Sequence, residues 1–542
     1  MTKTRVDVGP GLWVKFRRFL FPVTASGGNV VCHPLHPKKN IRPMKTWSRK
    51  DFLKASLIGG GAALVAGQTR LYGQVAGAAG SANGDIRVAV VGINAQGAGH
   101  MRDYLNKLPG SRLVAICDVD SEVLAKRAAE CEKGGVKVET YVDYRKLLEN
   151  KNIDAVVLAS PNHQHSLQTI WGLQAGKDVY CEKPLSHNVW EGRQAVAAAK
   201  KSTKNIVMAG TQNRSSLDIQ EAISILRSGK LGKIQWARGL CYKPRDSIGK
   251  TTGPQKVPDS INYDLWTGPA ELTPPRRNGT KGPVHYDWHW FWNYGGGDIT
   301  NQGIHQMDVA RWMLGEAGLP SSVASFGGRF GYLDDAETPN TLVSVFTYPS
   351  APLIFEVRGL PMKAGMKAMD AYRGSRVGVV VQCAGGYITV SESGTANIFD
   401  NDNKKIQGLS NGGNGSHRAN FVKAVQSRKV VQGLVEECHY SSALCHLGNV
   451  SFLLGKEQAN SAIAEAVKAD VSSSEAFGRV LEHLKANEVD TAKTKTVKGP
   501  LLKIDAKTEM FVGSEKTLID AANNNPLRKR AGRGAFTIPQ LA

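Results

Sequence analysis

Residues 86–99 have the sequence IRVAVVGINAQGAG, and this stretch decides the fold of the first half of the chain. A short apolar run from Ile86 to Val91 meets Gly92, where a chain that turns sharply from strand to helix needs glycine. Gly97 would let the following helix pack closely against the strand. Asn94 occupies the middle position of the motif, which is usually glycine, and asparagine tolerates a left-handed backbone better than most residues. The strand, glycine turn and helix at residues 86–99 predict a dinucleotide-binding turn, although Asn94 departs from the glycine motif.

The segments that follow repeat this alternation of strand and helix as far as residue 210. Alternating β-branched runs and amphipathic stretches are typical of a doubly wound parallel sheet. We expect strands at residues 86–91, 113–118, 140–142, 153–159, 178–181 and 206–210. Helices are expected at 98–108, 122–133, 144–149, 165–175 and 189–201. These elements predict a Rossmann domain over residues 83–210.

The pattern changes after residue 210, which indicates a second domain over residues 211–542. β-like runs at 323–330, 341–348, 353–358, 376–382 and 387–391 have no helices between them, so an open, largely antiparallel sheet is expected. Helices are expected at 219–226, 299–314, 418–426, 436–447 and 473–483. The tail from Lys485 looks loosely structured, although the apolar residues at 511–512 and 536–539 can pack back.

Polar residues at the ends of the predicted strands mark a cofactor site. Asp118 ends the second strand, where a carboxylate can accept hydrogen bonds from both ribose hydroxyls of the adenosine. The same charge would repel a 2′-phosphate, so NAD is favoured over NADP. The predicted cofactor-binding residues are Gly92, Asn94, Gly97, Asp118, Ser160, Asn162, His165 and Glu182. Lys183, in the same crevice, could hydrogen-bond a substrate hydroxyl or help to hold the nicotinamide.

The predicted helix 299–314 carries a candidate base. Asp298 is a plausible N-cap and Gly315 a stop. Asn301 and His305 are four residues apart and would share one face of the helix, where an imidazole could accept a hydroxyl proton. Gly303 inside the helix suggests that another group approaches the backbone closely.

Aromatic residues are concentrated at 286–294, immediately before this helix. They could form core or line a pocket for the CH-rich faces of a sugar. The candidate substrate contacts, chosen from their placement after strand ends or in this stretch, are Asn213, Arg214, Lys243, Trp290 and Asp287.

The first part of the chain resembles a leader. Residues 1–54 hold 12 Lys and Arg against 2 Asp and Glu, a large part of the net charge of +22, so nucleic acid binding is not indicated. The order of Arg49, Lys50 and a short uncharged run at 55–67 resembles a twin-arginine export signal with its second arginine replaced by lysine. We expect residues 44–82 to be this signal and linker, with a start at Met44 and a non-native extension at 1–43. The 8 cysteines are irregularly spaced and suggest no metal site; Cys117 and Cys181 are expected to be small buried thiols.

From residue 86 onward the chain is similar to the glucose–fructose oxidoreductase and inositol dehydrogenase family, Gfo/Idh/MocA. The resemblance rests on the glycine turn, Asp118 and the segments 160–165, 175–177, 182–184 and 295–305. It implies that Lys183 is the catalytic lysine and His305 the catalytic histidine. Asn301 occupies a position that is aspartate in inositol dehydrogenases, so a mechanism with a charged partner for the histidine is in doubt.

The resemblance implies an exported, periplasmic NAD-dependent oxidoreductase that moves hydride from an alcohol carbon of a sugar, glycoside or cyclitol. It also implies a homodimer or homotetramer and, during export, the twin-arginine translocase as partner. Two alternatives stay open. One is a hydrolase or lyase that oxidises a sugar only transiently on bound NAD, and the other is a non-catalytic sugar-binding protein with structural NAD.

Overall fold

The computed structural model describes residues 84–542 apart from 107, 278–281 and 411–414. The expected leader at 44–82 and the extension at 1–43 lie outside the described residues. Within the part that is described, no helix combines the length and the apolar character needed to cross a bilayer.

The first domain is built on a parallel sheet, as the sequence predicts. Within the described residues it has six strands in the order β3-β2-β1-β4-β5-β6. The strands are β1 (Ile86–Val91), β2 (Ser111–Cys117), β3 (Glu139–Tyr141), β4 (Ala155–Leu158), β5 (Asp178–Cys181) and β6 (Val207–Ala209). The helices are α2 (Gln96–Leu105), α3 (Ser121–Lys133), α4 (Tyr144–Glu149), α5 (His165–Gln174) and α6 (Val189–Lys201), with the short η1 (Asn162–Gln164) and η2 (Gln212–Ser215). Every residue of β4 and β5 is buried, as expected for parallel strands covered on both faces.

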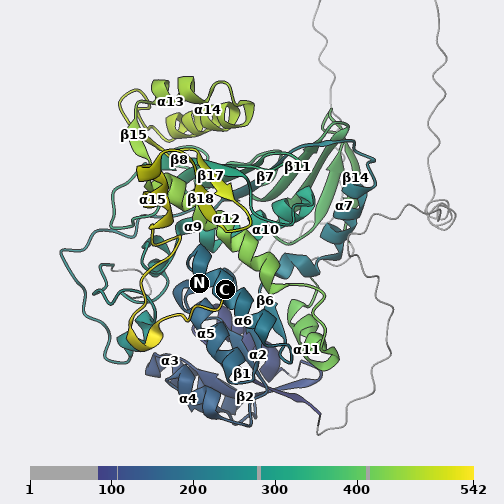
Figure 1. Cartoon of the computed structure of the whole chain (residues 1–542), viewed down its shortest axis with the longest axis vertical. Helices are drawn as coiled ribbons and strands as arrows, with labels where there is room; N and C mark the ends of the chain where they lie inside the picture. The colour runs from purple at the N-terminus through teal and green to yellow at the C-terminus, as the bar shows by residue number, and fades with distance from the viewer. Residues whose placement is uncertain (1–83, 107, 278–281, 411–414) are drawn as a thin grey trace, which may run out of the picture. The chain divides into compact units, whose positions relative to one another are not determined.

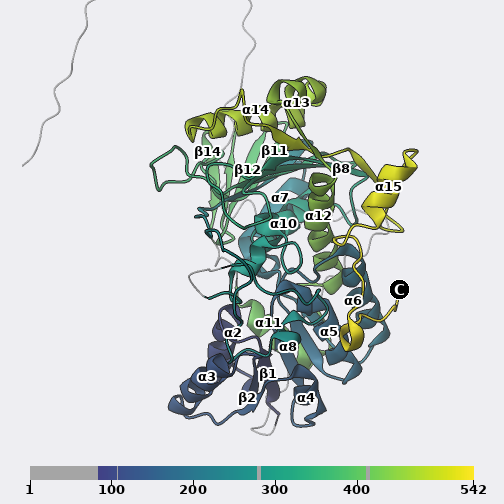
Figure 2. The ribbon, with the colours of Figure 1, turned by 90° about the vertical axis from the view of Figure 1, so that its left-hand side faces the viewer.

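Both faces of this sheet are covered by helices, partly from far along the chain. Helices α4, α5 and α6 pack on one face, together with Phe536 and Ile538 from the C-terminal end. Helices α2 and α3 pack on the other face, together with Phe421 and Val425 of α11 (His417–Ser427). The sequence analysis placed α11 in the second domain, but its apolar side belongs to the core of the first (Figures 1 and 2).

The second sheet is mixed and mostly antiparallel, which confirms the expected class. Among the described residues it has twelve strands, ordered β14-β13-β12-β11-β7-β10-β9-β8-β16-β15, with β17 and β18 attached beside β8. Only β7 and β10 pair in parallel. The strands are β7 (Ile234–Tyr242), β8 (Ser322–Gly328), β9 (Thr341–Thr347), β10 (Leu353–Arg358), β11 (Val377–Cys383), β12 (Gly386–Ser391), β13 (Ala396–Phe399), β14 (Lys405–Leu409), β15 (Lys456–Gln458), β16 (Thr496–Lys498), β17 (Leu502–Asp505) and β18 (Met510–Val512).

The helices of this domain cover the two faces of the second sheet unequally. They are α7 (Leu217–Arg227), α8 (Tyr263–Thr267), α9 (Gly297–Asn301), α10 (Gly303–Leu314), α12 (Val435–Leu453), α13 (Asn460–Val467), α14 (Val471–Ala486) and α15 (Lys516–Asn523), with η3 (Asp287–Trp290) and η4 (Gly534–Phe536). Helices α7, α10 and α12 share a large apolar core with one face, whereas α13 and α14 pack on part of the other. The tail after Lys485, expected to be loose, instead adds β16, β17, β18 and α15 to this domain.

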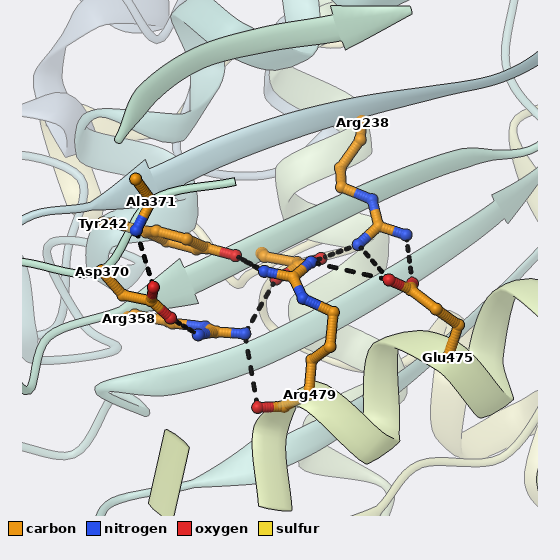
Figure 3. A network of polar contacts seen from close by, with 8 residues as sticks. Arg238, Tyr242, Arg358, Asp370, Ala371, Glu475 and Arg479 are labelled. Carbon is orange, nitrogen blue, oxygen red and sulfur yellow. Dashed lines mark hydrogen bonds and ion pairs between the residues drawn. The ribbon is translucent and has the colours of Figure 1, made fainter. Parts of the chain in front are cut away.

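A buried ion network lies under α14 on that second face (Figure 3). Glu356 on β10 accepts hydrogen bonds from Arg238 at 2.6 Å and Arg479 at 2.9 Å, and Tyr242 donates a third. Burial opposes ionisation of Glu356, but Arg238 and the other guanidinium groups lower the pKa of its carboxyl below the usual value. The network therefore joins α14 to the centre of the sheet through a buried charge.

The expected helix 299–314 is broken into α9 and α10 at Gln302. Gly303, the first residue of α10, lets Phe355 pack against the helix backbone, because a Cβ there would lie 2.5 Å from the ring of Phe355. Asp298 does not cap the helix as predicted; it binds the guanidinium of Arg245 at 2.7 and 2.6 Å. Gly315 ends α10 in the left-handed conformation, as predicted.

Candidate functional site: a dinucleotide cavity beside a lysine and a histidine

The glycine turn after β1 has the close approaches that the motif requires. Gly92 has φ +76°, and a Cβ on it would lie 2.6 Å from the backbone nitrogen of Ser160. A Cβ on Gly97 would lie 1.9 Å from the carbonyl oxygen of Gly92. No side chain caps the start of α2, so its first N–H groups are available to an anion such as a pyrophosphate.

Arg127 of α3 holds the backbone of this turn in place. Its guanidinium donates to the carbonyl oxygens of Ile93 and Asn94 at 3.1 and 3.0 Å. The sequence analysis missed this residue, because an arginine on an amphipathic helix carries no signal of its own for such a contact.

Asp118 lies directly after β2 and next to the turn. Its carboxylate accepts the N–H groups of Ile93 at 2.8 Å and Asp120 at 3.1 Å. Burial raises the pKa of Asp118, and these two N–H groups oppose that effect. Each carboxylate oxygen can accept more than one hydrogen bond, so the group can still receive ribose hydroxyls.

A cavity of about 360 Å³ runs along these residues. That volume is in the usual range for a small-molecule site. Of the predicted cofactor residues, Gly92, Asn94, Asp118 and Ser160 line it. The remaining wall comes from Val142 and Asp143 after β3, Gln168 and Trp171 of α5, a group from the second domain (Leu265, Trp266, His285, Tyr286, Trp288 and His289), and Phe536.

The second-domain wall of the cavity is shaped by an unusual turn. Tyr286 has φ +66° and ψ −58°, and the N–H of Asp287 donates to the carbonyl of His285 at 2.9 Å. This geometry is that of a classic γ-turn, which is rare and strained for a residue with a side chain. Next to it, the rings of Trp288 and His289 stack with centroids 3.7 Å apart. Part of the aromatic stretch therefore lines the dinucleotide cavity, and its predicted contact with a sugar stays a prediction.

The turn after β5 brings Lys183 to the junction of α9 and α10. Its Nζ donates to the carbonyl oxygen of Asn301 at 2.7 Å. His305 follows on the first turn of α10, and the Lys183 charge acts on its ring. Burial, with the Lys183 charge as second cause, lowers the pKa of His305 to about 3. The pKa of Lys183 is also lowered, chiefly by burial.

Three of the predicted ligand contacts have close protein partners in the structure, and their contacts with a ligand stay predictions. His165 has Pro184 and Ser160 carbonyl oxygens 2.6 and 2.7 Å from its two ring nitrogens, so it ties the β4 and β5 loops together. Arg214 is paired with buried Asp308 at 2.8 and 2.7 Å. These side chains fix the shape of the site.

Glu182 is the third of these residues, and its protein partners hold the turn after β5. Its carboxylate faces Nε2 of His100 at 2.9 Å and accepts from Gln212 at 2.8 Å. The Nδ1 of His100 in turn accepts from Arg418 at 2.8 Å. Burial alone would raise the pKa of Glu182, but the His100 hydrogen bond and the charges of His100 and Lys183 lower it well below its usual range.

The remaining candidates lie around this core without lining the cavity. Asn162 is buried, and its Nδ2 has no protein partner, which suits a ligand contact. Lys243 donates to Gln302 at 2.9 Å, at the helix break. Trp290 is buried under the guanidinium of Arg245, 4.9 Å from its ring centroid, and Asn213 is buried in η2. The seven cysteines of the described region are all buried and unpaired, and they include Cys117 and Cys181, as predicted.

The fold and this site define a two-domain architecture whose first domain is a Rossmann domain. Residues 86–211 match the description "Oxidoreductase family, NAD-binding Rossmann fold", and residues 228–324 match "Oxidoreductase family, C-terminal alpha/beta domain". These two segments are therefore similar to the two domains of the Gfo/Idh/MocA oxidoreductases.

Curated relatives agree with this assignment over part of their length. Inositol 2-dehydrogenase of Salmonella typhimurium is 26% identical over 180 residues, which cover 33% of this chain and 52% of the relative. Inositol 2-dehydrogenase 2 of Saccharopolyspora erythraea is 27% identical over 285 residues, covering 51% of this chain and 70% of the relative. The chain thus spans about half the length of the first of these relatives.

One solved structure with the same fold is the WlbA dehydrogenase of Chromobacterium violaceum in complex with NADH and UDP-GlcNAcA. It has a TM-score of 0.51 and 18% identity, and the match covers 68% of this chain and 94% of that chain. At this identity the likeness concerns the fold alone.

Proposed function

We propose that this protein is an NAD-dependent oxidoreductase that acts on a CH–OH group of a sugar, glycoside or cyclitol. The observation that carries the proposal is the convergence of Lys183 and His305 at the α9–α10 junction, in a chain whose glycine turn and Asp118 line a cavity for a dinucleotide. Relatives named inositol 2-dehydrogenase support the substrate class.

The residues present fit NAD. The turn at Gly92 and Gly97 has no room for a side chain, and no side chain caps the start of α2, so the backbone can approach a pyrophosphate. The Asp118 carboxylate next to this turn would repel the 2′-phosphate of NADP. When bound, the nicotinamide ring supplies the hydride acceptor.

The chain's own residues supply binding and proton transfer. Lys183 orients the alcohol and stabilises the negative charge that develops on its oxygen. A ring nitrogen of His305 accepts the hydroxyl proton, since a pKa of about 3 keeps the ring neutral near pH 7. The same low pKa makes the ring a weak base, so the proton must pass on quickly. Asn301, which is uncharged, does not raise that basicity.

The test is turnover of a panel of sugars and cyclitols by the full chain, followed as net NADH formation. Lys183→Ala and His305→Ala should each reduce kcat by at least about 100-fold, the usual scale for an acid–base group, while NAD still binds. Ser228→Ala, a substitution on the exposed surface after α7, is the matched control and should change neither quantity. Full activity in both site variants would refute the assignment. Product without net NADH would favour the transient-oxidation alternative.

We propose in addition that the protein is exported with its nucleotide already bound. The sequence pattern of residues 48–82 supports this, with a basic motif, an uncharged run and small residues near Ala76 and Ala78. Fractionation of the native host with N-terminal sequencing should find a chain cleaved near residue 78 outside the cytoplasm and carrying NAD. Uncleaved protein in the cytoplasm would contradict it.

A further inference from the structure

The last residues of the chain, 524–542, form a segment that we call the C-terminal strap. It leaves α15 in the second domain and runs beside α5 and α6 of the first (Figures 1 and 2). The family matches end at residue 324, so they assign no role to this segment.

Helix α6 holds both ends of the strap. The carbonyl oxygens of Leu527 and Arg528 accept the first two N–H groups of α6, at 3.2 and 3.0 Å. At the other end, the side chain of Gln194 accepts the N–H of Leu541 at 2.5 Å. The first two N–H groups of α6, those of Val189 and Trp190, have no acceptor within the helix, so the two strap carbonyl oxygens satisfy them.

Two arginines anchor the middle of the strap to the edges of the cavity. Arg530 pairs with buried Glu191 at 2.5 Å and donates to the carbonyl of His163, in the loop after β4, at 2.9 Å. Arg533 donates to the carbonyl of Gly268 at 2.6 Å, next to the second-domain wall. The strap therefore connects the first-domain loop at His163 with the second-domain segment at Gly268.

Between these anchors and the end of the chain, Phe536 becomes part of the cavity wall. Its side chain is 7% exposed, and its ring lies 6.2 Å from that of Trp171, with the Arg145 guanidinium over it at 5.3 Å. Ile538 is similarly buried, at 6%, and lines only a second cavity, which Phe536 also borders. Only one of these two apolar residues thus borders the dinucleotide cavity.

The position of Phe536 identifies which end of a dinucleotide it would meet. In the strand order β3-β2-β1-β4-β5-β6, Lys183 follows β5, whereas Val142 follows β3 on the opposite side of β1. The nicotinamide has to reach the Lys183 side, so the adenine lies toward β3 and α5. The wall there contains Val142, Gln168, Trp171 and Phe536.

We propose that the C-terminal strap completes the adenine pocket through Phe536 and slows the release of NAD. This inference rests on the proposed NAD site and adds the residue that closes it. An apolar ring beside an adenine removes both from water, and aromatic contact with a base contributes on a scale that changes affinity by about tenfold or more. Release of the nucleotide then requires the strap to open.

The test measures nucleotide release from full-length protein. NADH-loaded protein is mixed with excess NAD, and the loss of bound-NADH fluorescence gives the dissociation rate. Phe536→Ala should raise this rate about tenfold or more, and it should weaken ADP-ribose by a similar factor, because ADP-ribose has the adenine end without the nicotinamide. Ile538→Ala is the matched control on the same strap and should leave both quantities within about twofold of the wild type.

Arg533→Ala keeps the phenylalanine but removes an anchor, so it should raise the release rate by a smaller factor. Equal rates in Phe536→Ala and wild type, or equal increases in Phe536→Ala and Ile538→Ala, would overturn the strap proposal while leaving the NAD site intact. A wild-type protein that binds neither NAD nor ADP-ribose would instead refute the proposed function itself.

Discussion

Replacing Asn301 with aspartate tests how the protein sets the basicity of His305. The pKa of His305 is lowered to about 3, by burial first and by the Lys183 charge second. The Nζ of Lys183 donates to the Asn301 carbonyl at 2.7 Å, so a carboxylate at 301 would stand close to the Lys183 cation and to the His305 ring. A nearby opposite charge raises a base's pKa by about 1–3 units, and each unit is about 1.36 kcal/mol. We expect Asn301→Asp to bring the His305 pKa to about 4–6.

The assay is the pH dependence of kcat/KM, which reports the free enzyme. A base loses activity as pH falls through its pKa, so the wild-type acid limb from His305 should lie near pH 3. In Asn301→Asp the limb should move upward by about 1–3 units, whereas Asn301→Ser, which adds no charge, should leave it in place. Equal limbs in the two variants would refute the reasoning and move the search for the base away from His305.

Stability gives a second measurement for the same variants. Because the folded pKa of His305 lies below the unfolded value of 6.5, the unfolded state binds more protons between these values, and stability falls as pH is lowered through this window. At pH 4.5 the cost is on the order of 2–3 kcal/mol. Asn301→Asp should recover part of it, so its Tm relative to Asn301→Ser should improve from pH 7 to pH 4.5. A constant difference in Tm would contradict the charge argument.

Three further substitutions test the cofactor cradle and the buried network. Gly97→Ala would place a Cβ 1.9 Å from the Gly92 carbonyl and should weaken NAD by at least about tenfold in a titration, whereas Gly99→Ala, with only a flexible arginine tip 3.6 Å away, should not. Asp118→Ala should weaken NAD by about 1–3 kcal/mol and narrow the gap to NADP; a wild type that prefers NADP would contradict this. Glu356→Gln should destabilise the fold by about 3–5 kcal/mol in denaturant unfolding, because it leaves buried arginines uncompensated, with NAD affinity unchanged in the folded protein. Since the folded pKa of Glu356 is lowered, its contribution is present above the unfolded pKa and is lost as pH falls below it.

Most of the first domain could be predicted from the sequence because its signals are local. The strands at 86–91 and 178–181 and the helices at 144–149 and 189–201 have the bounds that the periodicity predicts. Each is a continuous apolar or amphipathic run between turn residues. The glycine turn could be identified for the same reason, since Gly97 contacts Gly92 within one strand–turn–helix unit and Gly92 has the positive φ that such a turn requires.

The sequence could not show the partners of side chains that pair over a long distance along the chain. Arg214 was predicted as a substrate contact, which stays a prediction, and nothing near residue 214 in the sequence reveals its pairing with Asp308. Asp298 has the residue type of an N-cap, yet the bidentate bond from Arg245 holds it elsewhere. A charged residue beside a helix end or strand end fits the local pattern of a cap or a ligand contact, and it fits that pattern equally well when it belongs to a distant ion pair. The role of such a residue depends on its partner in the folded protein, which the local sequence does not show.

The dinucleotide cavity shows why local patterns underestimate this site. Its walls come from the first domain, from residues 265–289 and from Phe536, so no single segment contains the pocket. The motif at 86–99 predicts the part of the site that would hold the phosphates and the ribose, because those contacts depend on a turn and a strand end. The covering wall depends on a γ-turn at Tyr286 and on a strap held by helix α6, which are tertiary features. Affinity for the cofactor should therefore depend on residues nearly at the end of the chain, although the sequence signal for the cofactor ends near residue 183.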